Sequence, residues 1–361
     1  MKILLSIHDT TNGGGTERVV INLANALCEL GHEVEILSLY QHHQSPAYAL
    51  NPAVRLRFLH HFDEPQTKRR FAHARNAISR RVMSWGLKKG GYDFIIASDT
   101  VYFPYFKNKK TTHIKLMHAS FDFAPRTKRN KLFDTLVILS SKELPLWQAH
   151  HKSVRVIPNF LPHIPQKCAN PAQKVVLSVG RMDRGEQKGF SRLLDIWQIL
   201  SRDEDFESEF KQWHLIIVGD GVLKPELERK VREFALTNVR LKPFTKDIES
   251  EYLSASIYAM SSHWEGFGMV LAEASACALP CVSFDIKTGP SDIIESEKSG
   301  FLVADGDLAG FAKVLKILMK DENLRAEFGC NAKKIVGEKF SKKAVLKLWQ
   351  GLFEEVARER I

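Results

Sequence analysis

The feature that most constrains the fold is a repeated alternation of short apolar segments with longer amphipathic ones. Segments with strand character lie at residues 2–7, 33–39, 93–97, 113–117, 135–139 and 154–157, and again at 174–179, 213–218, 239–242, 257–261 and 281–284. Helical segments separate many of them, for example at about 190–200 and 222–234. A strand, a helix and a second strand in succession pack as a right-handed parallel unit. The pattern therefore predicts an α/β fold with doubly wound parallel sheets.

Residues 158–165 interrupt this alternation. They contain Pro158, Pro162 and Pro165, and proline both fixes φ and removes a backbone donor. An extended linker suits such a segment better than a helix does. The chain of 361 residues also exceeds what one ordinary core needs. We therefore expect two domains, 1–160 and 161–341, followed by a last helix at about 342–361 with one apolar face.

Composition limits the class of protein. No apolar run approaches the roughly 20 residues that a membrane-spanning helix requires, and residues 1–7 are too short for a signal peptide. The five cysteines are scattered, so we expect them to be reduced, mostly buried and not zinc ligands, in a cytoplasmic protein. The net charge of +10 favours an anionic partner, which could be nucleic acid, a membrane surface or a phosphorylated substrate.

Residues 263–274 carry the most specific chemical pattern. Glu265 lies in a glycine-containing loop, and good helix formers from residue 269 to 276 place Glu273 inside a helix. The start of a helix offers free N–H groups and a partial positive charge, which suit a phosphate. A carboxylate before the helix can accept hydrogen bonds from sugar hydroxyls, and one within it can bind a ribose diol. The segment alone is also compatible with a buried helix behind a charged loop.

Other polar residues follow the predicted strands, where ligands of open α/β sheets bind. Glycines lie at 13–15 between the first strand and the first helix, and Arg181 and Lys188 follow the strand at 174–179. Two cations there can neutralise a leaving diphosphate. Gly219 follows the strand at 213–218, and the strand at 239–242, which contains Arg240, could pair its backbone with a flat base. Ordinary turns, loops and strands would account for each of these segments taken alone.

Taken together, these motifs resemble those of family 4 retaining glycosyltransferases, which have the GT-B architecture. The resemblance rests on the Glu-Gly-Phe-Gly…Glu pattern that starts at Glu265, on Gly-Arg…Lys-Gly-Phe at residues 180–190, and on the glycine loop at residues 13–15. It spans nearly the whole chain in order. One departure is Phe160, where many relatives have glycine at the hinge. The resemblance implies two Rossmann-like domains facing a central cleft, an acceptor-binding domain at 1–160 on which the last helix packs back, and a nucleotide-sugar-binding domain at 161–341.

The resemblance also assigns roles to individual residues. It implies catalytic roles for His118, which follows the strand at 113–117, and for Glu265, Arg181 and Lys188; Asp99 has weaker support. The implied nucleotide-sugar-binding residues are Gly14, Gly15, Arg181, Lys188, Gly219, Arg240, Glu265, Gly266, Phe267, Gly268, Met269, Val270 and Glu273. The family needs no metal and no cofactor, and we read neither Asp203–Asp205 nor Asp305–Asp307 as a metal pair; Asp307 is expected to cap a helix.

Residues 66–90 form a basic segment without any carboxylate. Its cations are Lys68, Arg69, Arg70, Arg75, Arg80, Arg81, Lys88 and Lys89. Phe71, Ile78, Val82 and Trp85 fall on one helical stripe, which we expect to face the core. The basic remainder could contact an anionic membrane surface or steer a phosphorylated acceptor. Binding of nucleic acid is not expected, because no nucleic-acid motif accompanies the charge.

The expected reaction is transfer of a hexose or N-acetylhexosamine from a UDP-sugar to a glycan or lipid-linked acceptor, with retention of the anomeric configuration. It would belong to surface polysaccharide or lipopolysaccharide biosynthesis. Residues 288–294 resemble segments of transferases that use UDP-hexoses or UDP-N-acetylhexosamines, which favours UDP over GDP-mannose. A GDP-mannose-dependent mannosyltransferase, a nucleotide-sugar epimerase and a phosphorylase are the alternatives. The expected location is cytoplasmic, with peripheral contact to the inner face of the membrane.

Overall fold

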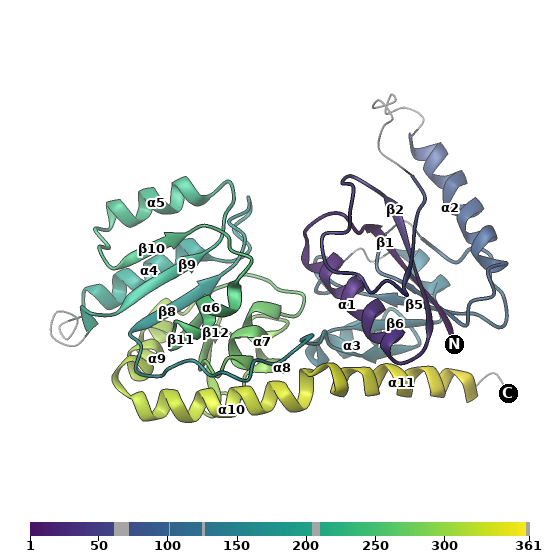
Figure 1. Ribbon diagram of the computed structural model, residues 1–361. Helices are drawn as coiled ribbons and strands as arrows, with labels where there is room; N and C mark the ends of the chain where they lie inside the picture. The colour runs from purple at the N-terminus through teal and green to yellow at the C-terminus, as the bar shows by residue number, and fades with distance from the viewer. Residues whose placement is uncertain (61–71, 101, 125–126, 204–209, 359–361) are drawn as a thin grey trace. The chain divides into compact units, whose positions relative to one another are not determined.

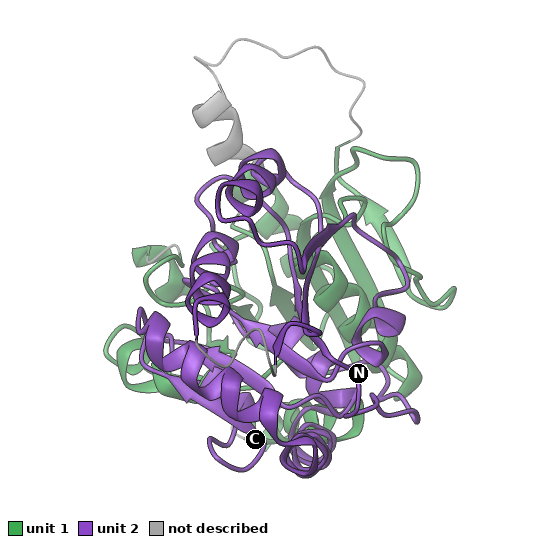
Figure 2. Cartoon of the chain, turned by 90° about the vertical axis from the view of Figure 1, so that its left-hand side faces the viewer, with its two compact units in different colours: residues 1–160, 342–361 green, residues 161–341 purple. Residues whose placement is uncertain are grey.

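The computed structural model describes residues 1–60, 72–100, 102–124, 127–203 and 210–358, without the side chains of residues 72–79. The chain divides into two compact units. Unit 1 comprises Met1–Phe160 and Lys342–Ile361, and unit 2 comprises Leu161–Ser341 (Figure 2). Each unit contains one parallel sheet with helices packed against it, so the α/β class and the two doubly wound domains predicted from the sequence are confirmed (Figure 1).

The seven described strands of unit 1 form one sheet in the order β3-β2-β1-β4-β5-β6-β7. Their bounds are β1 (Lys2–Asp9), β2 (Glu33–Tyr40), β3 (Arg55–Phe58), β4 (Phe94–Ala97), β5 (Thr112–Leu116), β6 (Thr135–Ile138) and β7 (Val154–Val156). The central strand β1 pairs with β2 and β4. Its residues Ile3, Leu4 and Leu5 have no exposed surface, because helices cover both faces of a doubly wound sheet.

The helices of unit 1 are α1 (Gly15–Glu29), α2 (Ala72–Lys88), α3 (Leu144–Gln148) and α11 (Lys342–Arg358), with short 3₁₀ helices η2 (Lys128–Leu132) and η3 (Ser141–Glu143). The last helix, α11, packs through one apolar face. Trp349 and Phe353 on that face are buried, and the Phe353 ring lies 4.4 Å from that of Phe94 on β4. Lys342 at its start pairs with Glu29 at the end of α1 at 2.6 Å. Residues 342–358 therefore belong to unit 1, although unit 2 precedes them in the sequence.

Unit 2 has a six-stranded sheet in the order β10-β9-β8-β11-β12-β13. The strands are β8 (Val175–Val179), β9 (His214–Val218), β10 (Val239–Lys242), β11 (Ile257–Met260), β12 (Cys281–Phe284) and β13 (Gly300–Val303). The helices are α4 (Phe190–Ser201), α5 (Lys224–Glu233), α6 (Ile248–Leu253), α7 (Met269–Ala276), α8 (Pro290–Ile293), α9 (Leu308–Lys320) and α10 (Glu322–Phe340). Asp307 caps α9 by accepting a hydrogen bond from the Gly310 N–H, as expected from the sequence.

The orientation of α2 differs from the expectation. Val82 and Trp85 are 61% and 53% exposed, whereas Met83 and Leu87 are buried. The prediction of a core-facing stripe through Val82 and Trp85 was therefore wrong. Successive residues of a helix point about 100° apart, so an apolar residue one position after the expected stripe lies on a different face of the helix. The expected stripe also included Phe71, which lies outside the described residues, and Ile78, whose side chain is not described.

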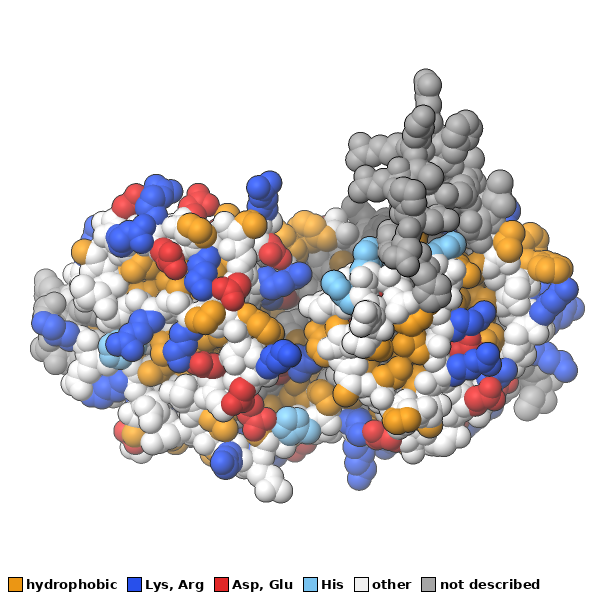
Figure 3. Space-filling model, turned by 45° about the horizontal axis from the view of Figure 1, so that its top comes forward, with side chains coloured by type: hydrophobic (Ala, Val, Ile, Leu, Met, Phe, Trp, Pro, Cys, Tyr) orange, Lys and Arg blue, Asp and Glu red, His pale blue; other side chains and the backbone are white. Residues whose placement is uncertain are grey.

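The described side chains of Lys and Arg do not gather into one patch on the face shown in Figure 3. Over unit 2 in particular, cationic and anionic side chains are interspersed. Within the described part of the chain, no helix is long and apolar enough to span a membrane.

Candidate functional site

The loops after β8, β9 and β10 in unit 2 pack closely together at the carboxyl edge of the sheet. Gly219 has φ +155°, and a Cβ atom there would lie 1.9 Å from the Gly180 carbonyl oxygen. Gly221 has φ +152°, and its Cβ would lie 2.3 Å from the Met182 carbonyl oxygen. Any side chain at either glycine would push these loops apart. The glycine after β9 therefore supports the loop that carries Arg181, rather than forming only a simple turn.

An ion pair between a partly buried lysine and a buried glutamate lies at this edge. The Lys188 Nζ donates to Glu265 Oε1 at 2.6 Å, and the two side chains are 17% and 7% exposed. The Ser262 hydroxyl donates to the same carboxylate oxygen at 2.7 Å. The aliphatic part of the Lys188 side chain packs against Gly180. A Cβ atom at Gly180 would lie 2.8 Å from the Lys188 Cγ. Two residues that are 77 positions apart and that the sequence assigned to the site are thus in direct contact.

Arg192 on α4 holds the backbone that leads to Glu265. Its guanidinium donates to the carbonyl oxygens of Ser261 and Ser262 and to Asp305 Oδ1, and it lies over the Phe284 ring at 4.1 Å. These bonds fix the loop after β11, and Ser262 in turn binds Glu265. This residue was not predicted from the sequence. The signal was a cation at the start of an apolar helix, four positions after Lys188.

Replacing Arg192 with methionine should lower the free energy of unfolding by about 2–4 kcal/mol, because two buried carbonyl oxygens would lose their donors. Turnover should also fall about tenfold, with a smaller effect on KM, because Glu265 would lose its fixed position. Urea unfolding and steady-state kinetics measure the two effects. The control is Arg229→Ala on the exposed face of α5, which should change stability by less than about 0.5 kcal/mol. Equal effects of the two variants would contradict the supporting role of Arg192.

The start of α7 suits an anion. Its N-terminal cap is Gly268, with φ +92° and no side-chain hydrogen bond to the helix. The first N–H groups of the helix, those of Met269 and Val270, are therefore not satisfied by a capping side chain. The side chain of Phe267 is buried against Phe340, with ring centroids 5.2 Å apart. Of the predicted binding residues, Phe267 can thus offer only its backbone, like Gly266 and Gly268.

Residues 288–294 lie beside this loop. The Thr288 hydroxyl donates to the Glu265 carbonyl oxygen at 2.6 Å. Gly289 has φ +99°, and a Cβ atom there would lie 2.4 Å from the Phe267 carbonyl oxygen. The segment that favoured a UDP donor in the sequence is therefore in contact with the Glu265 loop.

Glu273 lies on α7 and is oriented by α6. The Tyr252 hydroxyl donates to Glu273 Oε2 at 3.1 Å. Burial and the neighbouring Glu273 carboxylate raise the pKa of Tyr252 well above its usual value, so the phenol stays protonated and remains a donor. The sequence placed Glu273 inside a helix but did not identify Tyr252 as its partner.

Arg181 and Arg240 are less constrained than Lys188. The Arg181 side chain is 72% exposed and pairs with Asp183 at 3.3 Å. Arg240 is also exposed, on β10, which is the edge strand of the described sheet. Arg181 thus follows the carboxyl end of β8, whereas Arg240 is the second residue of β10, and neither joins the Lys188–Glu265 pair.

In unit 1 the glycine loop precedes α1. Gly14 is the N-terminal cap of α1 and makes no side-chain hydrogen bond to the helix, and its carbonyl oxygen accepts from the Tyr48 hydroxyl at 3.1 Å. A Cβ atom at Gly15 would meet no atom within 4 Å. The loop is thus open at Gly15, while the carboxylate of Glu17, in the first turn of α1, lies beside Gly14.

His118 follows β5 at the same edge of the unit 1 sheet. Its Nε2 is buried, and among the described residues it has no hydrogen-bond partner. Burial, with a contribution from the Lys115 charge, lowers the pKa of His118 to about 3. Lys115 donates to the Asp99 carbonyl oxygen. Asp99 itself accepts from the Ser6 hydroxyl and the Tyr102 N–H, both at 2.6 Å, so its carboxylate has structural partners.

The neutral imidazole of His118, whose Nε2 is buried, should make stability depend on pH. In the unfolded chain the pKa returns to about 6.5, so the unfolded state binds more protons between pH 6.5 and 3. The contribution is fully present above pH 6.5 and is lost as the pH falls toward the folded pKa. Between pH 7 and pH 4 the loss should amount to roughly 3 kcal/mol. Urea unfolding from pH 7 to 4 should show this loss in the wild type and much less of it in His118→Gln; identical slopes would contradict burial of a neutral ring.

A carboxylate–histidine pair in unit 1 was missed in the sequence. Asp9 at the end of β1 is buried. Its Oδ1 accepts hydrogen bonds from the backbone N–H and the hydroxyl of Thr11. Its Oδ2 accepts a hydrogen bond from the backbone N–H of His42 and another from the Nδ1 of the His42 ring. Burial opposes ionisation of Asp9, but these hydrogen bonds outweigh it and lower the pKa. The His42 side chain is 39% exposed. Only tertiary structure reveals the pair, because the two residues are 33 positions apart.

No group of three or more His, Cys, Asp and Glu side chains within the described ranges is arranged to hold a metal ion. Asp305 pairs with Arg192 and Asp203 with Lys316, while Asp205 lies outside those ranges. The five cysteines are free thiols. Cys277 and Cys281 are buried, but Cys168 and Cys330 are exposed, so burial of most cysteines was overestimated.

Comparison with known proteins agrees with this geometry. Residues 162–335 match the family model described as glycosyl transferases group 1, and residues 13–162 match that described as glycosyltransferase family 4. An uncharacterized glycosyltransferase of Haemophilus influenzae and the amylovoran biosynthesis glycosyltransferase AmsD of Erwinia amylovora are each 28% identical, over 97% of this chain and 99% of theirs. An α-1,4-N-acetyl-D-galactosaminyltransferase of Campylobacter jejuni is 28% identical over 92% of this chain and 93% of its own.

Among solved structures, a TarM variant of S. aureus in complex with Fondaparinux, α-GlcNAc-glycerol and UDP has the same fold. The TM-score is 0.76 at 16% identity, over 98% of this chain and 99% of that one. Two doubly wound parallel sheets of this kind define the GT-B architecture. The chain belongs to family 4 of the GT-B glycosyltransferases.

Proposed function

We propose that this protein is a retaining glycosyltransferase of surface polysaccharide assembly that uses a UDP-hexose or UDP-N-acetylhexosamine as donor. The observation that carries the proposal is the partly buried Lys188–Glu265 pair next to the open start of α7, with Glu273 on the same helix. Relatives of nearly full length support the pathway class. One is named for amylovoran biosynthesis, and another transfers N-acetylgalactosamine to an undecaprenol-linked glycan.

The proposed roles follow from charge and position. The diphosphate would bind at the first N–H groups of α7, with Lys188 and Arg181 as counter-charges, so a metal ion is not required for neutralisation. Glu273 would hold the ribose diol, and Glu265 would accept from hydroxyls of the donor sugar. The neutral ring of His118 can exchange hydrogen bonds with a sugar hydroxyl. Gly14, Gly15, Gly219 and Arg240 are assigned to donor binding by the family resemblance.

Retention would proceed on one face of the donor sugar. The bond from the anomeric carbon to the leaving phosphate oxygen breaks, and the acceptor oxygen forms a bond to that carbon. The acceptor proton passes to the leaving phosphate, so UDP carries it away and no protein nucleophile is needed. Lys188 and the α7 N–H groups stabilise the negative charge that develops on the diphosphate.

A thermal-shift panel of UDP, GDP, UDP-sugars and GDP-mannose tests the donor class, because a ligand that binds only the folded state raises stability by mass action. UDP and one UDP-sugar should raise the melting temperature by several degrees. A shift with guanine nucleotides alone would instead support the mannosyltransferase alternative.

The exposed face of α2 suggests contact with an anionic membrane. Trp85 is exposed, and Lys89 Nζ lies 3.7 Å from its ring centroid. An indole fits the bilayer interface, and each cation near an anionic surface contributes about 1 kcal/mol. By contrast, Arg80 and Arg81 lie over the rings of Phe103 and Tyr105 within unit 1 and are poorer candidates for the contact.

Co-sedimentation with anionic and neutral vesicles over a salt series measures this contact. The wild type should bind anionic vesicles more strongly, and a fraction should resist salt because Trp85 inserts. The variant Lys88→Glu/Lys89→Glu should lose the binding that is sensitive to salt. The variant Trp85→Ala should lose the binding that resists salt. The control Lys313→Glu/Lys334→Glu makes the same charge change on helices of unit 2. Equal retention on both vesicle types would rule out electrostatic docking.

A further inference from the structure

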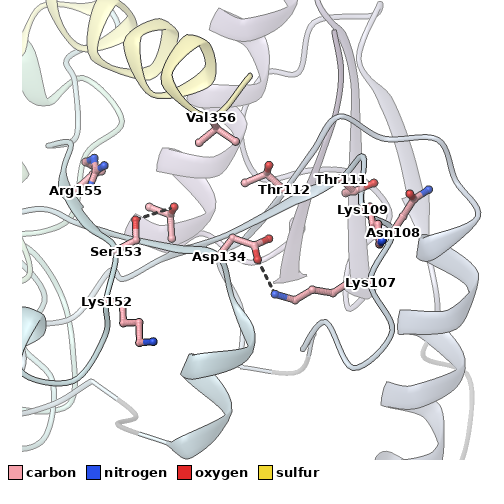
Figure 4. Close-up of a pocket in the computed structure, with 11 residues that line it drawn as sticks. Lys107, Asn108, Lys109, Thr111, Thr112, Asp134, Lys152, Ser153, Arg155 and Val356 are labelled. Carbon is pink, nitrogen blue, oxygen red and sulfur yellow. Dashed lines mark hydrogen bonds and ion pairs between the residues drawn. The ribbon is translucent and has the colours of Figure 1, made fainter. Parts of the chain in front are cut away.

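Unit 1 has a pocket at the amino-terminal edge of its sheet, opposite to the carboxyl edge at which His118 lies. The pocket has a volume of about 610 Å³. Apart from Val356 on α11, its lining residues lie just before strands or at their starts: Lys107, Asn108, Lys109, Thr111 and Thr112 at β5, Asp134 and Thr135 at β6, and Lys152, Ser153 and Arg155 at β7 (Figure 4). His118 follows β5 instead. A five-residue strand is roughly 17 Å long, so the pocket is remote from the edge at which His118 lies.

Cations dominate the lining of this pocket. Lys107, Lys109, Lys152 and Arg155 contribute positive charge, and Asp134 is the one carboxylate among the lining residues. Asp134 is engaged already, since its Oδ1 accepts from Lys107 Nζ at 2.6 Å and its Oδ2 accepts from the His113 N–H at 2.8 Å. Its negative charge therefore offsets the positive charge of Lys107, and its hydrogen bond with the His113 N–H fixes the start of β5.

The remaining cations differ in their pairing. Arg155 forms an ion pair with Glu355 of α11. Lys109 and Lys152 are exposed, and neither forms an ion pair with any residue that the structure describes. Both line the pocket and come from two different loops (Figure 4). Two unpaired ammonium groups around one recess leave a positive charge that an anion can neutralise.

The floor of the pocket adds a hydroxyl donor. Thr135 Oγ1 and Ser153 Oγ lie 3.1 Å apart, so one donates to the other and one proton remains for a ligand. The single aliphatic side chain in the lining is Val356. This polar composition does not suit an apolar ligand. A recess with several cations and a hydroxyl suits a phosphate, whose oxygens accept several hydrogen bonds at once. A volume of about 610 Å³ also leaves room for the group that carries the phosphate.

We propose that this pocket binds a phosphate group carried on a polar molecule, at a site separate from the nucleotide-sugar site. The proposal takes the phosphate of a saccharide as the ligand and in that respect rests on the proposed function. A lipid headgroup could present the same phosphate, and the vesicle arm of the experiment separates these two sources.

The test is isothermal titration of protein saturated with UDP, so that the proposed nucleotide site is occupied. The probes are glucose 6-phosphate, glucose, inorganic phosphate and phosphatidylglycerol vesicles. Glucose 6-phosphate should bind, and glucose should not. Lys109→Glu/Lys152→Glu should weaken that binding about tenfold or more. The control Lys128→Glu/Lys131→Glu makes the same charge change on η2, outside the pocket, and should leave the affinity within about twofold.

Several results would overturn the proposal. They are absence of binding of both glucose 6-phosphate and the vesicles, equal loss in both charge-reversal variants, or inorganic phosphate binding as tightly as the sugar phosphate. Binding of vesicles that is lost only in Lys109→Glu/Lys152→Glu would support the phosphate site and identify a lipid as its source. UDP affinity, measured beforehand in every variant, serves as the folding control. If UDP does not bind the wild type, the proposed function fails, while the sugar-phosphate titration still decides on the pocket.

Discussion

Replacing Lys188 with alanine should lower turnover about a hundredfold or more and lower the free energy of unfolding by about 3 kcal/mol. The two effects have separate causes. Turnover falls because a cation is lost from the developing charge of the diphosphate. Stability falls because Glu265, which is 7% exposed, would keep a buried charge without its partner at 2.6 Å. Steady-state kinetics and urea unfolding measure them separately.

A double variant distinguishes the two causes. Lys188→Met/Glu265→Gln leaves no unpaired charge, so its stability should return close to that of the wild type while turnover stays low. Lys339→Ala is the control, since it breaks the exposed pair with Glu295 and should change stability by less than about 1 kcal/mol. Arg181→Ala should lower turnover without a comparable loss of stability, because Arg181 is exposed. Near-wild-type turnover of Lys188→Ala would remove this residue from the site.

Replacing Glu273 with glutamine should weaken the binding of UDP itself about tenfold to a hundredfold, because a charge-assisted hydrogen bond to the ribose is worth about 1.5–3 kcal/mol. Glu265→Gln should leave UDP affinity nearly unchanged and lower turnover, because UDP lacks the donor sugar that Glu265 is proposed to bind. Calorimetry with UDP on both variants compares them directly. Tyr252→Phe, which removes the donor to Glu273 Oε2, should give a smaller loss of UDP affinity than Glu273→Gln.

Equal loss of UDP affinity in Glu265→Gln and Glu273→Gln would contradict this division of roles. Loss in neither variant would place the nucleotide elsewhere. Tyr252→Phe also checks the geometry, since an unchanged affinity in this variant would show that α6 does not orient the Glu273 carboxylate.

Local patterns in the sequence were sufficient for most of the fold. Alternation of apolar and amphipathic segments predicted both sheets, and the bounds of β10, β12 and α7 and the start of α11 agree with the structure. The short strand β3 was missed because Arg55–Phe58 alternates polar and apolar residues at a sheet edge and has no continuous apolar run. Strand β13 was not among the predicted strands, and its pairing with β12 comes from tertiary structure.

The site was predicted less completely. Glu265, Lys188 and Glu273 were identified by their positions after strands and within a helix, but their contacts join residues far apart in the sequence. The Lys188–Glu265 pair spans 77 positions and the Tyr252–Glu273 bond joins two helices. Periodicity also failed on α2, since apolar residues lie on more than one of its faces and only packing determines that Met83 is buried and Trp85 exposed.

The most direct test of the central claim is an NMR time course with a panel of UDP-hexoses and UDP-N-acetylhexosamines, with and without an undecaprenol-linked glycan acceptor. We predict that one donor releases UDP only when the acceptor is present, and that the new anomeric signal has the configuration of the donor. Conversion of the donor without an acceptor would support an epimerase. A product with inverted configuration, or transfer from GDP-mannose and from no UDP-sugar, would contradict the account.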